Sequence, residues 1–229
     1  ACRVAAGAIA KQILMTKGIA IFGYVSKVGK MRLDKSYENL DLTKTYENAI
    51  RCPDEEMAAK FIQHIEEVKS TGDSVGGIVT CVIKKLPAGL GEPIYDKFHA
   101  ALGSAMLSIN AVHGFEYGSG FAGTDLLGSE HNDAFIQTPE GVVTKTNHSG
   151  GIQGGITNGM DVYFNVAFKP TSTIAKPQKT INQLGESIDL ENIGRHDPCV
   201  LPRAVTVVEA MAALVAIDML LANKLATWQ

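Results

Sequence analysis

The sequence has no large excess of charge of either sign and no long uninterrupted apolar run. Its formal net charge is -3, with charged residues making up 20% of 229, so it lacks the basic field that attracts nucleic acid or an anionic membrane surface. Lys and Asp interrupt each apolar stretch, Asp218 in the last one, before the roughly 18 residues that a bilayer span needs. We therefore expect no nucleic-acid partner and no membrane segment.

Cysteine is also scarce. The four cysteines stand at positions 2, 52, 81 and 199, at no metal-ligand spacing and in too small a number for a secreted disulfide framework. His113, His131 and His148 match no metal motif either, so we expect no metal site. Buried free thiols of a reducing cytoplasm are the simplest interpretation, and we expect a cytoplasmic protein.

The first residues, ACRVAAGAIAKQIL, contain neither an initiating Met nor the pattern of a secretory signal. Ala5, Ala6, Ile9 and Ile13 recur at helical spacing, and no capping residue precedes them. We expect these residues to lie inside a helix and the parent protein to continue upstream of Ala1.

The apolar content is high: 45% of the residues are hydrophobic and 23 more are glycine, which is enough for one large domain over residues 1–229 and a buried subunit interface. Helical and alternating patterns follow one another along the first half of the chain. They predict helices that end at Gly18, run from Pro53 to Gly72 and cover about 94–109, with strands over 18–29, 76–85 and 112–118 and a loop over 30–46. This alternation indicates an α/β or α+β protein whose βα units share one sheet.

The composition changes after Tyr117. Residues 117–159 are rich in Gly, Asn, Asp, Ser and Thr, with a hairpin turn expected at 139–141. A polar stretch of this length inside a compact domain is more often functional than idle. A strand over 160–169, the loop KPTST and a last helix over 200–226 complete the prediction.

Three loops have the chemistry of a binding site. Gly150–Gly159 lets a ligand approach the backbone, although it lacks a dinucleotide fingerprint and its glycines equally suit ordinary turns. Lys169–Thr173 offers an ammonium and three hydroxyls, which suit a phosphate or an ordinary polar turn. Arg195 adds a forked donor for a phosphate or carboxylate.

Asp197 has two candidate roles. Followed by Pro198, it is typical of a helix N-cap. In a dry pocket beside a ligand, the same carboxylate could exchange a proton.

Taken together and in order, SINAVHGFE, GSGF, GSEHND, NHSGGIQGGITNG, KPTST, RHDPC and VLPRAVTVVEAM resemble the chorismate synthase family over essentially the whole chain. The resemblance implies a βαβ sandwich, a homotetramer and a carbon–oxygen lyase of the shikimate pathway. The substrate would be 5-enolpyruvylshikimate 3-phosphate, which loses phosphate in a 1,4-elimination that gives chorismate and requires reduced FMN. Whether NAD(P)H or an outside reductase reduces the flavin stays open.

The resemblance also implies roles for particular residues. Asp197 matches an aspartate near the reactive flavin nitrogen, where it would handle the proton. The residues that match FMN contacts are Asn110, Ala111, Gly154, Lys169, Pro170, Thr171, Ser172, Thr173 and Arg195.

One departure from the family matters for function. Two N-terminal segments whose histidines act as acids in that family, Gly-Glu-Ser-His-Gly and Pro-Gly-His-Ala-Asp, do not occur in these 229 residues. We therefore expect this chain to be inactive by itself. The alternative is a non-catalytic flavin- or phosphate-binding oligomerisation module.

Overall fold

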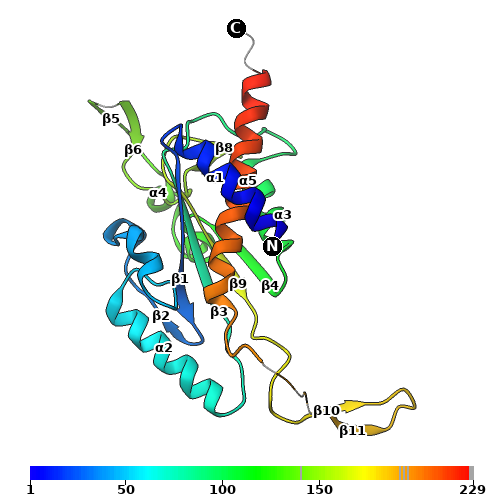
Figure 1. The fold of residues 1–229 in the computed structure, drawn as a ribbon. Helices are drawn as coiled ribbons and strands as arrows, with labels where there is room; N and C mark the ends of the chain where they lie inside the picture. The colour runs from blue at the N-terminus through cyan, green and yellow to red at the C-terminus, as the bar shows by residue number, and fades with distance from the viewer. Residues whose placement is uncertain (140, 191, 193, 195, 227–229) are drawn as a thin grey trace.

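A five-stranded antiparallel sheet forms the centre of the computed structural model, which describes residues 1–139, 141–190, 192, 194 and 196–226 (Figure 1). The strand order is β2-β1-β3-β9-β4. These strands are β1 (Ala20–Val28), β2 (Met31–Arg32), β3 (Gly77–Lys84), β4 (Val112–Tyr117) and β9 (Val162–Phe168). The α+β class is therefore confirmed, and the predicted βα units do share one sheet.

Strand β9 is inserted between two strands that a helix connects. Both β3 and β4 pair antiparallel with β9, so they point in the same direction. Helix α3 (Phe98–Leu107) joins them, which makes β3–α3–β4 a crossover split by a strand from later in the chain. This insertion brings the end of β9 beside the start of β4.

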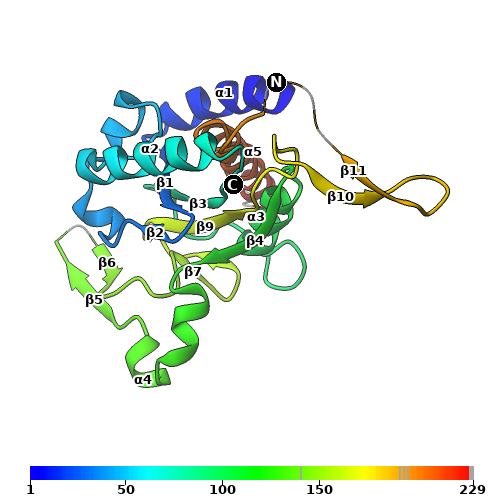
Figure 2. The same cartoon turned by 90° about the horizontal axis from the view of Figure 1, so that it is seen from below.

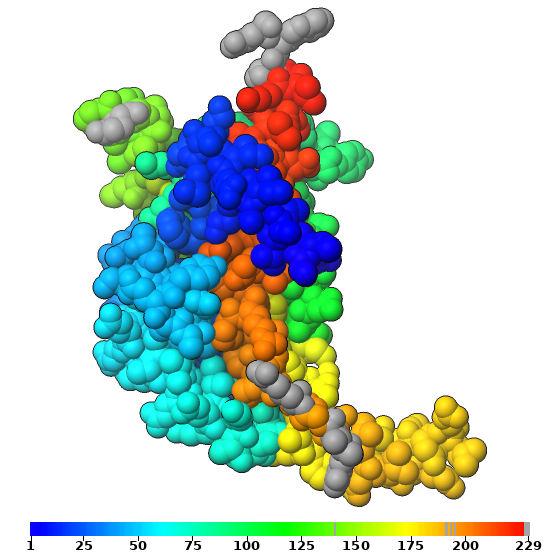
Figure 3. Space-filling view, in the orientation of Figure 1, coloured from blue at the N-terminus to red at the C-terminus, as the bar shows by residue number. Residues whose placement is uncertain are grey.

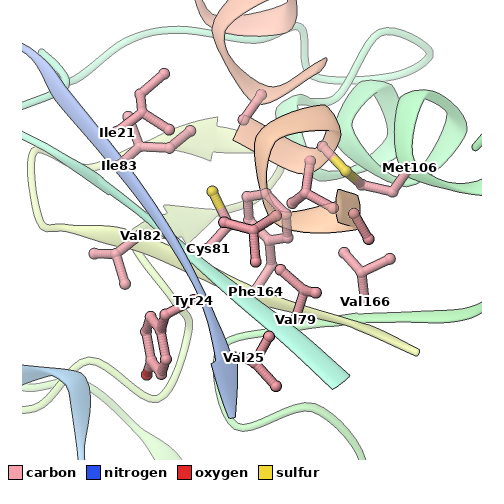
Figure 4. Close-up of a cluster of buried hydrophobic side chains, with 14 of the residues drawn as sticks. Ile21, Tyr24, Val25, Val79, Cys81, Val82, Ile83, Met106, Phe164 and Val166 are labelled. Carbon is pink, nitrogen blue, oxygen red and sulfur yellow. The ribbon is translucent and has the colours of Figure 1, made fainter. Parts of the chain in front are cut away.

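Helices α1 (Cys2–Met15), α3 and α5 (Leu201–Ala226) cover one face of the sheet (Figures 1 and 2). Alternate strand residues point toward them, as strand geometry requires. Figure 4 shows Cys81, Phe164 and Val166 on this helical side, with Tyr24 and Val82 on the other. The buried apolar side chains form one continuous cluster, which fills the space between the sheet and these helices and extends to Tyr24 and Val82 on the other side.

Helix α2 (Glu55–Ser70) begins two residues after the predicted start at Pro53. Asp54 is its N-cap and accepts a hydrogen bond from the Met57 amide at 2.8 Å, with Glu55 and Glu56 favourably placed in the first turn. The opening helix α1 has no side-chain cap, as the sequence predicts, and it is followed by Gly18 at φ 76°.

Helices α1 and α5 pack closely where Gly7 of α1 faces Ala210 of α5. A Cβ added to Gly7 would lie 2.4 Å from the Ala210 Cβ. Gly7→Val is therefore expected to force the helices apart and to lower the free energy of unfolding by roughly 3 kcal/mol. Urea unfolding tests this, with Ala8→Val on the exposed side of the same helix as the matched control; equal effects of the two changes would contradict the crossing.

Several boundaries differ from the prediction. Helix α3 begins at Phe98 rather than near Ile94, and the Phe98 amide donates to Gly155 O at 2.7 Å. The segment 30–46 contains β2 and the 3-10 helices η1 (Tyr37–Asn39) and η2 (Leu42–Glu47).

The polar stretch after Tyr117 is built from short elements. These are η3 (Gly120–Asp125), α4 (Gly128–His131), β5 (Phe135–Thr138), β6 (Gly141–Thr144), β7 (Ile152–Gln153) and β8 (Ile156–Thr157). Strands β5 and β6 pair antiparallel around the predicted turn. A further hairpin, β10 (Gln178–Ile181) with β11 (Ser187–Leu190), was not predicted and projects from the body (Figure 3).

Helix α5 corrects the expectation that no apolar segment reaches membrane-spanning length. Its 26 residues are long and apolar enough to cross a bilayer by length and composition, because its few charged residues, Asp218 among them, do not offset its alanine- and leucine-rich sequence. Half of its apolar window is buried against the sheet and α1, which is how a core helix behaves.

Candidate active site

Three segments far apart in the sequence meet at the end of β9. The Lys169 amide donates to Ala111 O at 2.9 Å, which joins the KPTST loop to the turn before β4. The Thr171 hydroxyl donates to Asp197 O, also at 2.9 Å. The strand order thus brings together Asn110–Ala111, Lys169–Thr173 and Asp197.

The KPTST loop is held by its neighbours. Ser74 donates its hydroxyl proton to Thr171 O at 2.6 Å, and the Val75 amide donates to Pro198 O at 2.8 Å. The Thr171 hydroxyl also positions the loop, through its hydrogen bond to Asp197 O. Among the described residues, the Lys169 ammonium and the hydroxyls of Ser172 and Thr173 have no hydrogen-bond partner, and all three side chains are exposed.

Ala111 adopts φ 69° although it is not glycine. Such a conformation is uncommon for a residue with a Cβ and is stored strain that the surrounding structure must hold. The hydrogen bond from the Lys169 amide to Ala111 O is one interaction that holds this conformation. Strain of this kind is found most often at functional sites, and the predicted flavin contact of this turn stays a prediction.

Asp197 does not cap helix α5. The helix begins at Leu201, where the amides of Arg203 and Ala204 donate to Val200 O, so Asp197 lies too far upstream. Its carboxylate instead accepts a hydrogen bond from Arg203 Nη1 at 2.5 Å, and about a third of its side chain is exposed. The capping hypothesis is wrong, because Cys199 and Val200 extend the chain before the first turn.

The other members of the RHDPC segment contribute less. His196 Nε2 donates to Asn192 O at 3.0 Å, and Arg195 lies outside the described residues. Burial raises the pKa of the Cys199 thiol to about 11. This thiol therefore stays protonated at neutral pH and is unsuited to act as a nucleophile.

Asn110 lines a cavity of about 420 Å³ beside this cluster. Two guanidinium groups line it, those of Arg3 and Arg203, together with Val200 and Val207. Arg3 Nη1 also donates to Ser108 O at 3.0 Å. The sequence analysis did not select either arginine. The one available signal was the position of Arg203, six residues after Asp197, in the helix start where the two side chains form an ion pair.

Gly154 lies apart from the cluster. It forms the turn between β7 and β8, next to the start of α3, where Gly155 accepts from the Phe98 amide. Asn110 follows the end of α3, so about 15 Å of helical rise along that helix separates the two positions. Gly154 is exposed at φ 61° with nothing within 4 Å of its Cβ position, and its predicted flavin contact stays a prediction.

Asp133 organises the NHSGG loop. Its buried carboxylate accepts hydrogen bonds from the Thr146 hydroxyl at 2.7 Å and from the amides of His148 and Ser149 at 2.8 Å each. His131 Nε2 lies 2.8 Å from Ser119 Oγ. These residues of the GSEHND and NHSGG motifs thus have structural partners that sequence spacing alone did not show.

Asp133 should make stability depend on pH. Burial opposes its ionisation, but the hydrogen bonds from Ser149, Thr146 and His148 outweigh burial and lower the pKa of this carboxyl. A lowered folded-state pKa contributes stability above the unfolded value near 4, and this contribution is lost as pH falls through the folded pKa. Asp133→Asn should therefore cost about 2 kcal/mol at pH 7 and less at pH 3, measured by urea unfolding at both pH values; an equal cost at both would contradict this role.

Known proteins resemble this chain over nearly its whole length. The chorismate synthase family model matches residues 1–221. The chorismate synthase of Christiangramia forsetii is 58% identical over 98% of this chain and 62% of its own length, and that of Cytophaga hutchinsonii is 56% identical over 97% and 62%.

A solved chorismate synthase crystal structure superposes with a TM-score of 0.80 at 31% identity, covering 97% of this chain and 62% of the other. The chain therefore spans about 62% of the length of the relatives it matches. On these sequence and structural matches, the chain belongs to the chorismate synthase family.

Proposed function

We propose that the complete protein is a chorismate synthase that eliminates phosphate from 5-enolpyruvylshikimate 3-phosphate and requires reduced FMN. Family membership supports this activity. The observation that carries it furthest is the meeting of Asn110–Ala111, Lys169–Thr173 and Asp197 at one end of the sheet. Because the relatives are longer than this chain, we assign the activity to the complete protein.

The residues of the cluster fit the phosphate of FMN. Lys169, Ser172 and Thr173 offer one ammonium and two hydroxyls without protein partners among the described residues, and such groups satisfy phosphate oxygens. The strained Ala111 turn would lie against the same ligand, and Pro170 and Arg195 are assigned with them from the resemblance. When bound, reduced FMN supplies electron density to the substrate transiently, with no net redox change.

Asp197 holds the proton in this proposal. Its carboxylate is partly exposed and oriented by Arg203, so one oxygen can face a ligand while the guanidinium fixes the side chain. A carboxylate that transfers a proton must lie within hydrogen-bond reach of the atom concerned. Arg203 acts here as a positioning residue.

The remaining assignments are supported by the resemblance alone. They are a homotetrameric assembly, a cytoplasmic location and the choice between NAD(P)H and an outside reductase for reducing the flavin. Native mass spectrometry of the complete protein would test the assembly directly.

The proposal is tested by measuring chorismate formation. The complete protein, incubated anaerobically with 5-enolpyruvylshikimate 3-phosphate and reduced FMN, is expected to release chorismate and phosphate in equal amounts. Residues 1–229 alone should release neither. FMN binding by the complete protein without any chorismate would instead support the non-catalytic binding module.

A further inference from the structure

The sheet face that points away from α5 carries a chain of polar side chains. Thr80 Oγ1 donates to Asn165 Oδ1 at 2.6 Å and lies 2.7 Å from Ser26 Oγ. Asn165 Nδ2 donates to Glu116 Oε1 at 3.0 Å. Because the Thr80 hydroxyl has one proton, Ser26 must donate to it, so the chain crosses the strands β1, β3, β9 and β4.

The residues that face α5 show which side of the sheet these polar side chains occupy. Cβ atoms added to Gly23 and Gly77 would contact Glu209 and Leu201 of α5, so these positions face the helices. Thr80 lies three residues after Gly77 in β3, so its side chain points to the opposite face of the sheet. Ser26 lies in the register shift between Val25 and Lys27 of β1. Both side chains line a cavity on the face away from the helices. A sheet face packed on protein is normally apolar, so this polar face is suited to water or a polar ligand.

Above this face lies a cavity of about 420 Å³. Its floor contains Tyr24, Ser26, Thr80, Tyr163 and Asn165. Its walls come from Tyr37 and from the loop with Asn147 and His148. The volume falls within the range of small-molecule sites.

Positive charge dominates the rim. Arg32, Lys35 and Lys145 line the cavity, against one carboxylate, that of Glu38. Lys35 pairs with Asp54 at 2.5 Å. Within the part of the chain that the structure describes, Arg32 and Lys145 have no ion pair, and the Tyr163 hydroxyl has no hydrogen-bond partner.

We propose that this cavity binds a small hydroxylated phosphate ester, of the size of a sugar phosphate. The phosphate would lie between Arg32 and Lys145, because two unpaired cations suit a doubly charged group. The ligand hydroxyls would meet the hydroxyls and amide of the floor, which can both donate and accept. This site is separate from the candidate active site, whose residues lie at the end of β9 and the start of α5.

Isothermal titration calorimetry of the complete protein, saturated with FMN, tests this site. The probes are glucose 6-phosphate, inorganic phosphate, gluconate and glucose. Glucose 6-phosphate should bind most tightly, because it alone combines a dianion with ring hydroxyls. Arg32→Gln and Lys145→Gln should each raise its Kd about tenfold, and Tyr163→Phe about fivefold.

Two lysine variants serve as matched controls. Lys44→Gln removes an exposed cation outside the cavity, and Lys169→Gln removes the cation of the candidate active site; both should leave the Kd for glucose 6-phosphate unchanged. The site is refuted if no probe binds at millimolar concentration in at least 10-fold molar excess over the protein. It is also refuted if Lys169→Gln weakens the binding of glucose 6-phosphate while Arg32→Gln does not. Tighter binding of gluconate than of glucose 6-phosphate would overturn the assignment to a phosphate ester.

Discussion

Replacing Glu209 by alanine is expected to lower the free energy of unfolding by about 4 kcal/mol. Glu209 is buried in α5 and accepts hydrogen bonds from the Gly23 amide at 2.7 Å, Lys11 Nζ at 2.7 Å and the Tyr46 hydroxyl at 2.8 Å. One carboxylate thus joins α5 to β1, α1 and η2. Its removal leaves a buried amide and a cation without a partner, and unpaired buried groups are costly.

Two substitutions make this result specific. Glu209→Gln keeps the shape and an acceptor for Gly23 but loses the ion pair with Lys11, so it should cost clearly less than alanine. Asp218→Ala removes an exposed carboxylate from the same helix and should change the unfolding free energy by less than about 0.5 kcal/mol. Equal urea midpoints for Glu209→Ala and the wild type would show that the network contributes nothing.

Asp197→Asn in the complete protein is expected to lower kcat by roughly 100-fold or more, since general acid–base groups contribute about that much. The amide can still accept from Arg203 Nη1, so the loop should keep its shape. It cannot take up or release the proton. Steady-state chorismate formation measures the loss, and FMN titration of the same variant should give a Kd close to that of the wild type.

Arg203→Gln is the companion variant. It removes the guanidinium that orients Asp197 without removing the carboxylate, so it should reduce kcat less and shift the pH profile of kcat. An Asp197→Asn variant with wild-type kcat would leave Asp197 a purely structural role.

Much of the fold follows from local pattern. The period of apolar residues predicts α1, α2 and α5 and the strands β1, β3 and β9, because each element buries one face or both. The sequence also predicts that Lys169–Thr173 is a polar loop after a strand, because its Lys and hydroxyl side chains have no place in an apolar core. Local pattern does not reveal that β9 inserts between β3 and β4, since strand order depends on contacts between distant segments.

The errors near α5 have a physical cause. An Asp before a Pro is a good cap in isolation, but the helix starts three residues later and Asp197 pairs with Arg203 instead. The role of Asp133 was equally hidden, because its three partners lie 13 to 16 residues away along the chain. Tertiary contacts, rather than propensity, decide both positions.

The most direct test of the account is FMN binding by the complete protein and its Lys169→Gln variant, followed by flavin fluorescence. If the loop Lys169–Thr173 holds the flavin phosphate, the variant should raise the Kd about tenfold, while Lys44→Gln leaves it unchanged. An unchanged Kd for Lys169→Gln would contradict the flavin site placed at the end of β9.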